Sequence, residues 1–287
     1  RPPGVPTHGY ASNTPASDGT HVFAFFGKSG VYAYDLDGNE IWNQSVGQEP
    51  SNKGFGSAAS PIVTDEHVIV NAADESLAIV WLDKKTGQEV FRAEAGGLGE
   101  CWTTPVLVDN LEESEIVVSV IGEVWGLSNR TGKLSWYAKG VNSRKAQVSP
   151  IVHEGVVYVS GQESYAIRVG GKDDISKSNT VWQGRMAPRY ATPVLVQGRL
   201  YSVNGSVVEC VDAKTGKRIF QGRLPTSVGA SAGATGNERG TEDRPGEDRG
   251  GRDGDGQRDA RNQANRQNGG FGGGGFDRGG FGGGRGG

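Results

Sequence analysis

The sequence repeats itself about every 45 residues, and this repetition restricts the possible folds more than any other feature. A Ser/Thr-Pro pair occurs five times, at intervals of 46, 44, 45 and 43 residues. Most of these pairs are followed by an apolar stretch, a turn and a strand of alternating residues. The five pairs are Thr14-Pro15, Ser60-Pro61, Thr104-Pro105, Ser149-Pro150 and Thr192-Pro193. Four short strands in each unit are typical of a β-propeller blade.

Each unit ends in a polar turn followed by an aromatic residue. Three of the turns contain Thr-Gly, where glycine permits the positive φ of a hairpin corner; in the fourth unit the longer segment 170–180 replaces the turn. A single sheet exposes apolar surface on both faces, so it needs a neighbouring sheet on each side. We therefore predict an all-β propeller of four-stranded blades. The predicted blade-docking residues are Trp42, Gly87, Phe91, Gly132, Trp136, Trp182, Gly216 and Phe220.

The C-terminal segment 229–287 differs in composition from the rest of the chain. It contains 22 Gly, nine Arg and nine acidic residues but no Trp or Tyr, so it cannot bury a core. We predict a propeller domain over residues 1–228 and a disordered, low-complexity Gly/Arg-rich tail over residues 229–287. The five predicted units are about 14–59, 60–103, 104–148, 149–191 and 192–225.

The unit 210–220, Cys-Val-Asp-Ala-Lys-Thr-Gly-Lys-Arg-Ile-Phe, resembles the A-x-D-x-x-T-G-x-x-x-W repeat of the pyrroloquinoline-quinone-like (PQQ-like) propeller family. Residues 82–87 and 129–136 match parts of the same pattern, and the resemblance extends from Thr14 to Phe220. It implies that each closing aromatic residue docks on the Thr-Gly peptide of an adjacent blade. It also implies eight blades, so the five visible units would be a fragment; a closed five-bladed ring is the alternative.

Composition and motifs exclude several other classes of protein. No apolar run approaches the roughly 18 residues of a membrane-spanning helix, and the net charge of −3 gives no strong nucleic-acid signal. Cys101 and Cys210 are too few for a disulfide framework or a four-thiolate zinc site. The histidines lie far apart, and we expect His21, His67 and His153 to be solvated residues in turns. No catalytic or metal-ligating residue is predicted.

One segment of each unit is expected to lie near the central axis. In a propeller, the residues before each inner strand approach the axis on one face, so reading them across the units gives a ring of side chains. The aromatic and charged character of this ring suits a protein or peptide partner, and packing that merely plugs the channel is the alternative. The candidate axial binding ring consists of Tyr10, Asn13, Glu100, Trp102, Lys145, Gln147, Arg189 and Tyr190.

The resemblance implies one of two functions. The family contains PQQ-dependent alcohol and sugar dehydrogenases, and a non-catalytic set that binds proteins and includes the outer-membrane assembly lipoprotein. The dehydrogenases hold calcium through a Glu and an Asn, use an Asp base and carry a Cys-Cys pair. The candidate ring has Glu100 and Asn13 but no Asp, and Cys101 has no neighbouring cysteine. We therefore expect a non-catalytic scaffold without a cofactor, with a fragment of a PQQ- and calcium-dependent dehydrogenase as the alternative.

A third function concerns the tail. In the Gly- and Phe-rich half of the tail, residues 269–287, Arg-Gly-Gly occurs at 278–280 and 285–287, and such segments contact single-stranded RNA through charge and stacking. The equal numbers of basic and acidic residues argue against it. The family resemblance implies a periplasmic, cell-envelope or secreted location.

Overall fold

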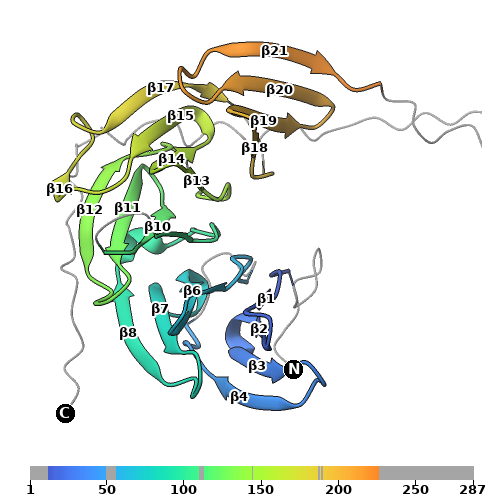
Figure 1. The fold of residues 1–287 in the computed structure, drawn as a ribbon, viewed down its shortest axis with the longest axis vertical. Coiled ribbons are helices and arrows are strands. Elements are labelled where there is room, and N and C mark those ends of the chain that lie inside the picture. Colours follow the sequence, from blue (N-terminus) through green and yellow to red (C-terminus); the bar gives the residue numbers. More distant parts are fainter. Residues whose placement is uncertain are drawn as a thin grey trace, which may run out of the picture. The chain divides into compact units, whose positions relative to one another are not determined.

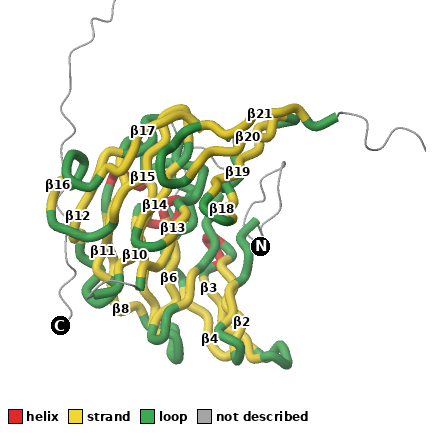
Figure 2. The backbone as a smooth tube through the Cα atoms, turned by 45° about the horizontal axis from the view of Figure 1, so that its top comes forward, coloured by secondary structure: helices red, strands yellow, loops and turns green. Residues whose placement is uncertain are grey.

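The computed structural model describes residues 12–49, 56–109, 113–143, 145–186, 188 and 190–225. These residues form five antiparallel sheets that follow one another along the chain (Figure 1). Strands dominate, and the helical segments are single turns: η1 (Gly27–Ser29), α1 (Ala73–Ser76) and η2 (Gly96–Leu98) (Figure 2). The prediction of an all-β propeller of four-stranded blades is confirmed. The predicted tail and its boundary at residue 228 lie outside the described residues.

The strands of each sheet are consecutive in the sequence, with one exception. The first sheet contains β1 (Ala16–Ser17), β2 (His21–Phe25), β3 (Val31–Asp35) and β4 (Glu40–Gln44), and the second contains β5 (Ile62–Val63), β6 (His67–Ala72), β7 (Ala78–Asp83) and β8 (Glu89–Glu94). The third contains β9 (Val106–Val108), β10 (Glu115–Ser119), β11 (Glu123–Ser128) and β12 (Leu134–Lys139). The fourth contains β13 (Ile151–His153), β14 (Val156–Val159), β15 (Gly161–Arg168) and β17 (Thr180–Met186), and the fifth contains β18 (Val194–Val196), β19 (Arg199–Asn204), β20 (Val207–Asp212) and β21 (Arg218–Arg223). The exception is β16 (Asp173–Asp174), which leaves the fourth unit and pairs in parallel with β12.

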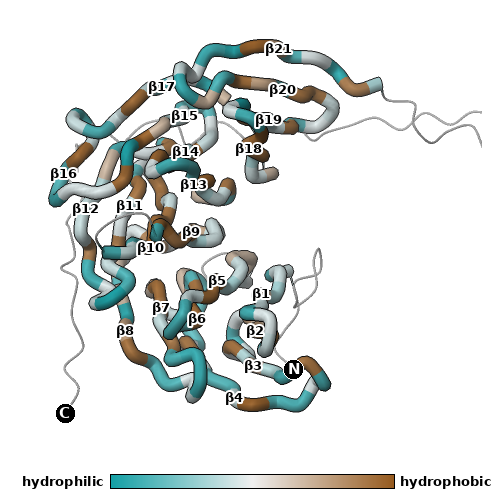
Figure 3. The backbone as a smooth tube through the Cα atoms, in the orientation of Figure 1, coloured by the Kyte–Doolittle hydropathy of each residue, from teal (hydrophilic) through white to brown (hydrophobic). Residues whose placement is uncertain are grey.

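Apolar side chains on both faces of the sheets form the core. In β6 every residue is buried, because Val68 and Val70 face the first sheet while Ile69 faces the third. Equivalent clusters lie between the third and fourth sheets and between the fourth and fifth. Figure 3 shows the hydrophilic residues gathered at turns and the apolar ones along the strands. Each sheet is therefore stabilised by its neighbours in the chain.

A register shift occurs at the same place in all five sheets. It lies where the third strand of each unit pairs with the last strand. The shift follows directly after the residue of the third strand that pairs with the closing aromatic residue. Every unit thus places its closing aromatic residue in the same register, so the sequence repeat and the sheet repeat coincide. The five pairs are Ala33–Trp42, Trp81–Phe91, Gly126–Trp136, Ala166–Trp182 and Cys210–Phe220.

The Ser/Thr-Pro pairs link neighbouring sheets by hydrogen bonds. The backbone N–H of Thr14 donates to Ser60 Oγ over 2.9 Å, and that of Ser60 donates to Thr104 Oγ1 over 3.0 Å. The N–H of Thr104 continues the series to Ser149 Oγ, at 2.9 Å. A hydroxyl is needed at these positions as the acceptor for the preceding unit. Each proline directly precedes the inner strand of its sheet, and the hydroxyl before it has a role that the sequence alone did not indicate.

Closing aromatic residues dock on turn glycines of the next sheet. Trp42 Nε1 donates to the carbonyl of Lys84 over 3.0 Å, and its ring lies where a Cβ on Gly87 would be 2.6 Å away. Only a residue without a side chain allows this approach. Trp182 makes the same contact with Gly216, where a Cβ would lie 2.7 Å from the indole ring. Phe91 approaches Gly132 through its own Cβ, which would lie 2.9 Å from a Cβ on the glycine.

Two of the predicted docking residues behave differently. The fourth unit has no Thr-Gly turn, so Trp136 packs instead against Gly126 of its own sheet, and its indole N–H donates to Glu115. Phe220 is 46% exposed, because the fifth sheet is the last one described, and its ring lies 6.3 Å from that of Tyr201. Among the described residues, Phe220 therefore has no docking glycine on another sheet.

We expect Gly87→Ala to destabilise the protein by about 2–4 kcal/mol. The backbone strain of alanine at a φ of +74° contributes about 1 kcal/mol, and the clash with Trp42 contributes the rest. Gly38→Ala is the matched control, because Gly38 has a φ of +86° but nothing within 4 Å of its Cβ position. Denaturant unfolding of both variants measures the difference. Equal losses would show that the aromatic contact contributes nothing.

Candidate binding face

The described residues of the candidate ring lie at one end of the sheets, here called the connector face. Because the strands are antiparallel, the connections between second and third strands lie at the same end as the connections between consecutive sheets. The connector face therefore includes η1, α1, the residues after β10 and β14, and the segments that precede the inner strands. The Thr-Gly turns lie at the opposite end.

Three of the predicted ring residues, Glu100, Trp102 and Lys145, are brought together. The backbone N–H of Trp102 donates to the carbonyl of Ala146 over 2.8 Å, and that of Ala146 donates to the carbonyl of Glu100 over 3.2 Å. These bonds join the segments that precede the third and fourth inner strands. They place Lys145 Nζ 5.8 Å from the centroid of the Trp102 ring, within the range of a cation–π contact.

Trp102 has a second contact, and the other described residues of the ring have different surroundings. Trp102 also donates its indole N–H to the carbonyl of Gly56 over 2.9 Å, so it ties the second and third inner segments together. Asn13 donates its amide to the carbonyl of Ala59 over 2.8 Å, and Tyr190 is 59% exposed. The predicted ring members that lie outside the described residues are Tyr10 and Arg189.

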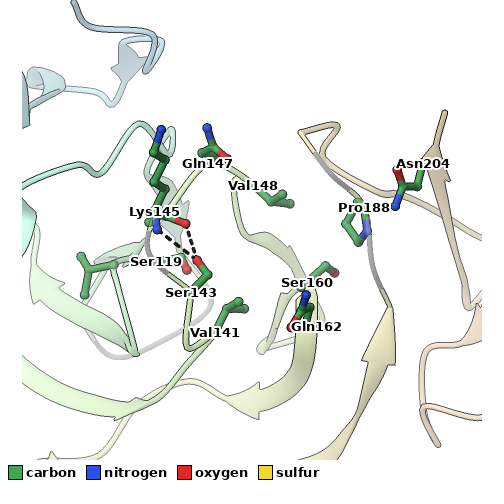
Figure 4. A pocket seen from close by; sticks show the side chains of 13 residues that line it. Ser119, Val141, Ser143, Lys145, Gln147, Val148, Ser160, Gln162, Pro188 and Asn204 are labelled. Atoms are coloured by element: carbon green, nitrogen blue, oxygen red, sulfur yellow. Dashed lines mark hydrogen bonds between the residues drawn. The ribbon is translucent and has the colours of Figure 1, made fainter. Parts of the chain in front are cut away.

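A cavity of about 280 Å³ opens on the connector face between the third, fourth and fifth units (Figure 4). Lys145 and Gln147, both predicted from the sequence, form one side of it, and Pro188 and Asn204 form the other. The other lining residues are Ser119, Val120, Val141, Ser143, Ala146, Val148, Ser160, Gly161 and Gln162.

Several lining residues were missed because they follow the second strand of a unit rather than precede its first. Ser119, Ser160 and Asn204 lie at corresponding points, at or directly after the ends of β10, β14 and β19. Small polar residues at one register position of three consecutive units are the signal that could have identified them. Reading two connections per unit, instead of one, recovers most of the cavity.

Among the described residues that line the cavity, Lys145 provides the only formal charge. Ser143 fixes the backbone of Lys145, because its hydroxyl donates to the carbonyl of Lys145 and accepts the N–H of Lys145 at 3.3 Å. Gln147 and Gln162 add amides, and Ser160 adds a hydroxyl. The cavity thus offers one cation and several neutral hydrogen-bonding groups.

The described residues do not fit a quinone with calcium. Among them, no three His, Cys, Asp or Glu side chains are grouped closely enough to hold a metal ion. The amide of Asn13 is bonded to the carbonyl of Ala59, and the ammonium of Lys145 lies over the ring of Trp102, where a flat ligand would stack. The thiol of Cys101 is buried and contacts Thr103 and the carbonyl of Ser119, and burial raises its pKa.

Two buried titratable groups lie outside the cavity. Glu75, in α1, is fully buried, neither carboxylate oxygen has a hydrogen-bond partner among the described residues, and burial raises its pKa to about 8. His67 was expected to be solvated, but it is buried, because it is the first residue of β6 and its ring packs against Phe91 at 5.8 Å. Burial lowers the pKa of His67, which favours the neutral ring.

Comparison with known proteins gives one family match. A family model described as outer membrane protein assembly factor BamB matches residues 6–231. The PQQ-like resemblance found in the sequence is thereby confirmed. No curated protein matches the sequence significantly. Within the described residues, no helix has the length and apolar character needed to cross a lipid bilayer.

Two solved structures share the fold. BamB from Moraxella catarrhalis has a TM-score of 0.57 and 14% identity, over 72% of this chain and 62% of that chain. The quinohemoprotein alcohol dehydrogenase ADHIIG from Pseudomonas putida HK5 has a TM-score of 0.53 and 15% identity, over 74% of this chain and 42% of that chain. This chain therefore spans less than two thirds of either relative, and identities this low show the fold alone.

Proposed function

Because this chain belongs to the family of the outer membrane protein assembly factor BamB, we propose that it is a non-catalytic propeller scaffold. In this proposal it holds no cofactor, acts in the cell envelope and binds a protein partner through its connector face. The observation that carries the proposal is the cavity beside Lys145 and Gln147, which lies where connections from three units meet.

A rigid connector face supports a binding role. The segments around Trp102 and Ala146 are held by backbone hydrogen bonds, and the inner strands are linked by the Ser/Thr hydroxyl series. A surface that is already ordered loses little conformational freedom when a partner binds, so more of the contact energy appears as affinity. Trp102 and Lys145 give this surface the aromatic and cationic character of a protein interface.

A dehydrogenase is the second candidate, because ADHIIG shares the fold. The chemistry of the described residues opposes it: the ring lacks an Asp base, and Lys145 is a cation where calcium would need oxygen ligands. The RNA contact considered for the tail has no support from the family match, and the tail lies outside the described residues.

Site-specific photo-crosslinking tests the proposed binding face. A photoreactive amino acid at Gln147 should form an adduct with an envelope protein, whereas the same group at Gln88, at the opposite end of the second sheet, should form none. Adducts from Gln88 alone would contradict the proposal. Adding PQQ and calcium should leave thermal unfolding unchanged and produce no dye-coupled alcohol oxidation. Quinone-dependent oxidation would favour the dehydrogenase instead.

A further inference from the structure

We propose that the fifth sheet of one copy of this chain packs against the first sheet of a second copy, in a head-to-tail contact. The inference goes beyond the proposed scaffold function and uses neither the connector face nor its cavity. It depends on three properties of the two outer sheets: exposed apolar and aromatic faces, the two unmatched halves of a repeated contact, and opposite charges.

The fifth sheet has an exposed apolar face. Leu200 is buried against the fourth sheet, so Tyr201 and Val203, which alternate with it along β19, point the opposite way. In each earlier sheet, the next sheet covers the corresponding face and completes an apolar cluster. The exposed apolar residues on this face of the fifth sheet are Val194, Val203 and Phe220, and cross-strand pairing places Val194 and Phe220 in one row with Tyr201. An exposed face of this kind marks an interaction site.

The first sheet presents aromatic residues on its outer face. Val31 is buried against the second sheet, so Tyr32 and Tyr34, of which Tyr32 directly follows Val31 in β3, lie on the opposite face. The two tyrosine rings are stacked, with centroids 6.2 Å apart and planes 8° from parallel, and Phe26 meets Tyr32 edge-on at 5.6 Å. Both tyrosines are half-buried. Aromatic side chains are enriched in protein interfaces, so this face suits the apolar face of the fifth sheet.

The contact between a closing aromatic residue and a turn glycine has an unmatched half in each outer sheet. In three internal cases, the aromatic residue of one sheet meets a glycine of the next: Trp42–Gly87, Phe91–Gly132 and Trp182–Gly216. Phe220 is the aromatic half, and the described chain has no following sheet to receive it. Gly38, in the turn after β3, is the glycine half.

The geometry of Gly38 fits the receiving position. Its φ is +86°, against +74° for Gly87, and no described residue lies within 4 Å of its Cβ position. Its turn is one residue shorter than the Thr-Gly turns, but it likewise connects the third strand of its sheet to the last. The first sheet of a second copy would therefore offer Phe220 the glycine that each internal aromatic residue finds on the next sheet.

The two outer units carry opposite charges. Residues 12–49 contain five acidic residues and one lysine, a net charge of −4, whereas residues 190–225 contain five basic and two acidic residues, a net charge of +3. Two of these charges lie on the outer faces, because Glu40 pairs with Tyr34 and Arg199 alternates with Tyr201. A first and a fifth sheet attract each other, whereas two first sheets or two fifth sheets repel. Charge therefore favours a head-to-tail contact over a symmetric one.

Sedimentation velocity of the full chain at several protein concentrations tests the proposal. The average mass should increase with concentration and decrease at high salt, which screens the charges. Because a head-to-tail contact leaves one outer sheet free on each terminal copy, species larger than a dimer should form. Phe220→Ser should weaken the association about tenfold. Ile219→Ser is the matched control, since Ile219 is equally exposed but lies on the other face of β21, and it should change nothing.

Mixing two blocked variants tests the direction of the contact. Tyr34→Arg blocks the first sheet and Phe220→Glu blocks the fifth, so each variant alone should remain monomeric. Their equimolar mixture should form dimers and nothing larger, because one open sheet remains on each partner. Recovery of the dimer in the mixture also shows that both variants fold.

Other results would overturn the proposal. Self-association of Phe220→Glu alone would show a contact between two first sheets, and self-association of Tyr34→Arg alone would show one between two fifth sheets. Equal losses in Phe220→Ser and Ile219→Ser would exclude the apolar face of the fifth sheet. A full chain that is monomeric at every concentration would leave that face to another occupant, either residues 226–287 or a different protein.

Discussion

Replacing Glu75 by Gln should make the protein more stable near pH 9 and leave its stability near pH 5 almost unchanged. Glu75 is fully buried, and within the described part of the chain neither of its carboxylate oxygens has a hydrogen-bond partner. Burial raises its pKa from 4.5 to about 8, so the folded protein holds a proton that the unfolded chain releases at much lower pH. The neutral amide of Gln mimics that protonated state at every pH.

The direction of the effect follows from the proton balance. Because the folded state binds the proton more tightly, the free energy of unfolding falls as the pH rises from about 4.5 to about 8. Integrated over that window, the loss is on the order of a few kcal/mol. The negative charge of Asp74 raises the pKa further, whereas the ammonium of Lys28 lowers it. Gly27 also faces the carboxyl group, since a Cβ there would lie 3.1 Å from Oε1.

Denaturant unfolding at several pH values measures this prediction. The difference between Glu75→Gln and the wild type should widen from pH 5 to pH 8 and then remain constant. Asp65→Asn is the control, because it removes one negative charge from an exposed turn of the same sheet. A difference that does not depend on pH, or one matched by the control, would show that Glu75 does not hold a proton in the folded state.

The sheets could be predicted from the sequence because their determinants are local and repeated. The alternation of residues such as Val31 and Tyr32 within a strand, and the turn glycines such as Gly87, depend on neighbours within one unit. Because the pattern occurs five times, a unit whose strands are ambiguous can be interpreted from the other units. The docking of Trp42 on Gly87 was expected only through the family resemblance, since nothing within one unit indicates which turn an aromatic residue will meet.

The site was less predictable because its determinants come from different units. Lys145 and Gln147 were found by reading one segment of each unit across the repeats, but their partners in the cavity come from a second set of connections. Nothing in the sequence indicated that Glu75 would be buried, because a Glu beside Asp74 in a short polar segment is typical of an exposed turn. The connection after the first sheet, which is distant in the sequence, contacts this turn: Glu49 donates its N–H to the carbonyl of Glu75 over 2.8 Å.

The largest loss of stability is expected from Trp136→Ala. Trp136 is fully buried between the third and fourth sheets, and its indole N–H donates to Glu115 Oε2 over 2.7 Å. Removing the ring should cost about 3–5 kcal/mol for the cavity alone. The fit is close, since a Cβ on Gly126 would lie 2.1 Å from the indole. The surrounding side chains therefore have little freedom to fill the space.

Trp136→Phe separates packing from hydrogen bonding. Phenylalanine keeps an aromatic ring but leaves the buried carboxyl of Glu115 without its donor, at a cost of about 1–3 kcal/mol. Burial raises the pKa of Glu115, and the hydrogen bond from Trp136 lowers it, so losing that bond disfavours the charged form. The cost of Trp136→Phe should consequently increase with pH. In Trp182→Phe the acceptor that loses its donor is the neutral carbonyl of Ala213, so the cost of this substitution should not depend on pH. Parallel pH profiles for the two variants would show that the Trp136 indole does not stabilise the Glu115 carboxylate.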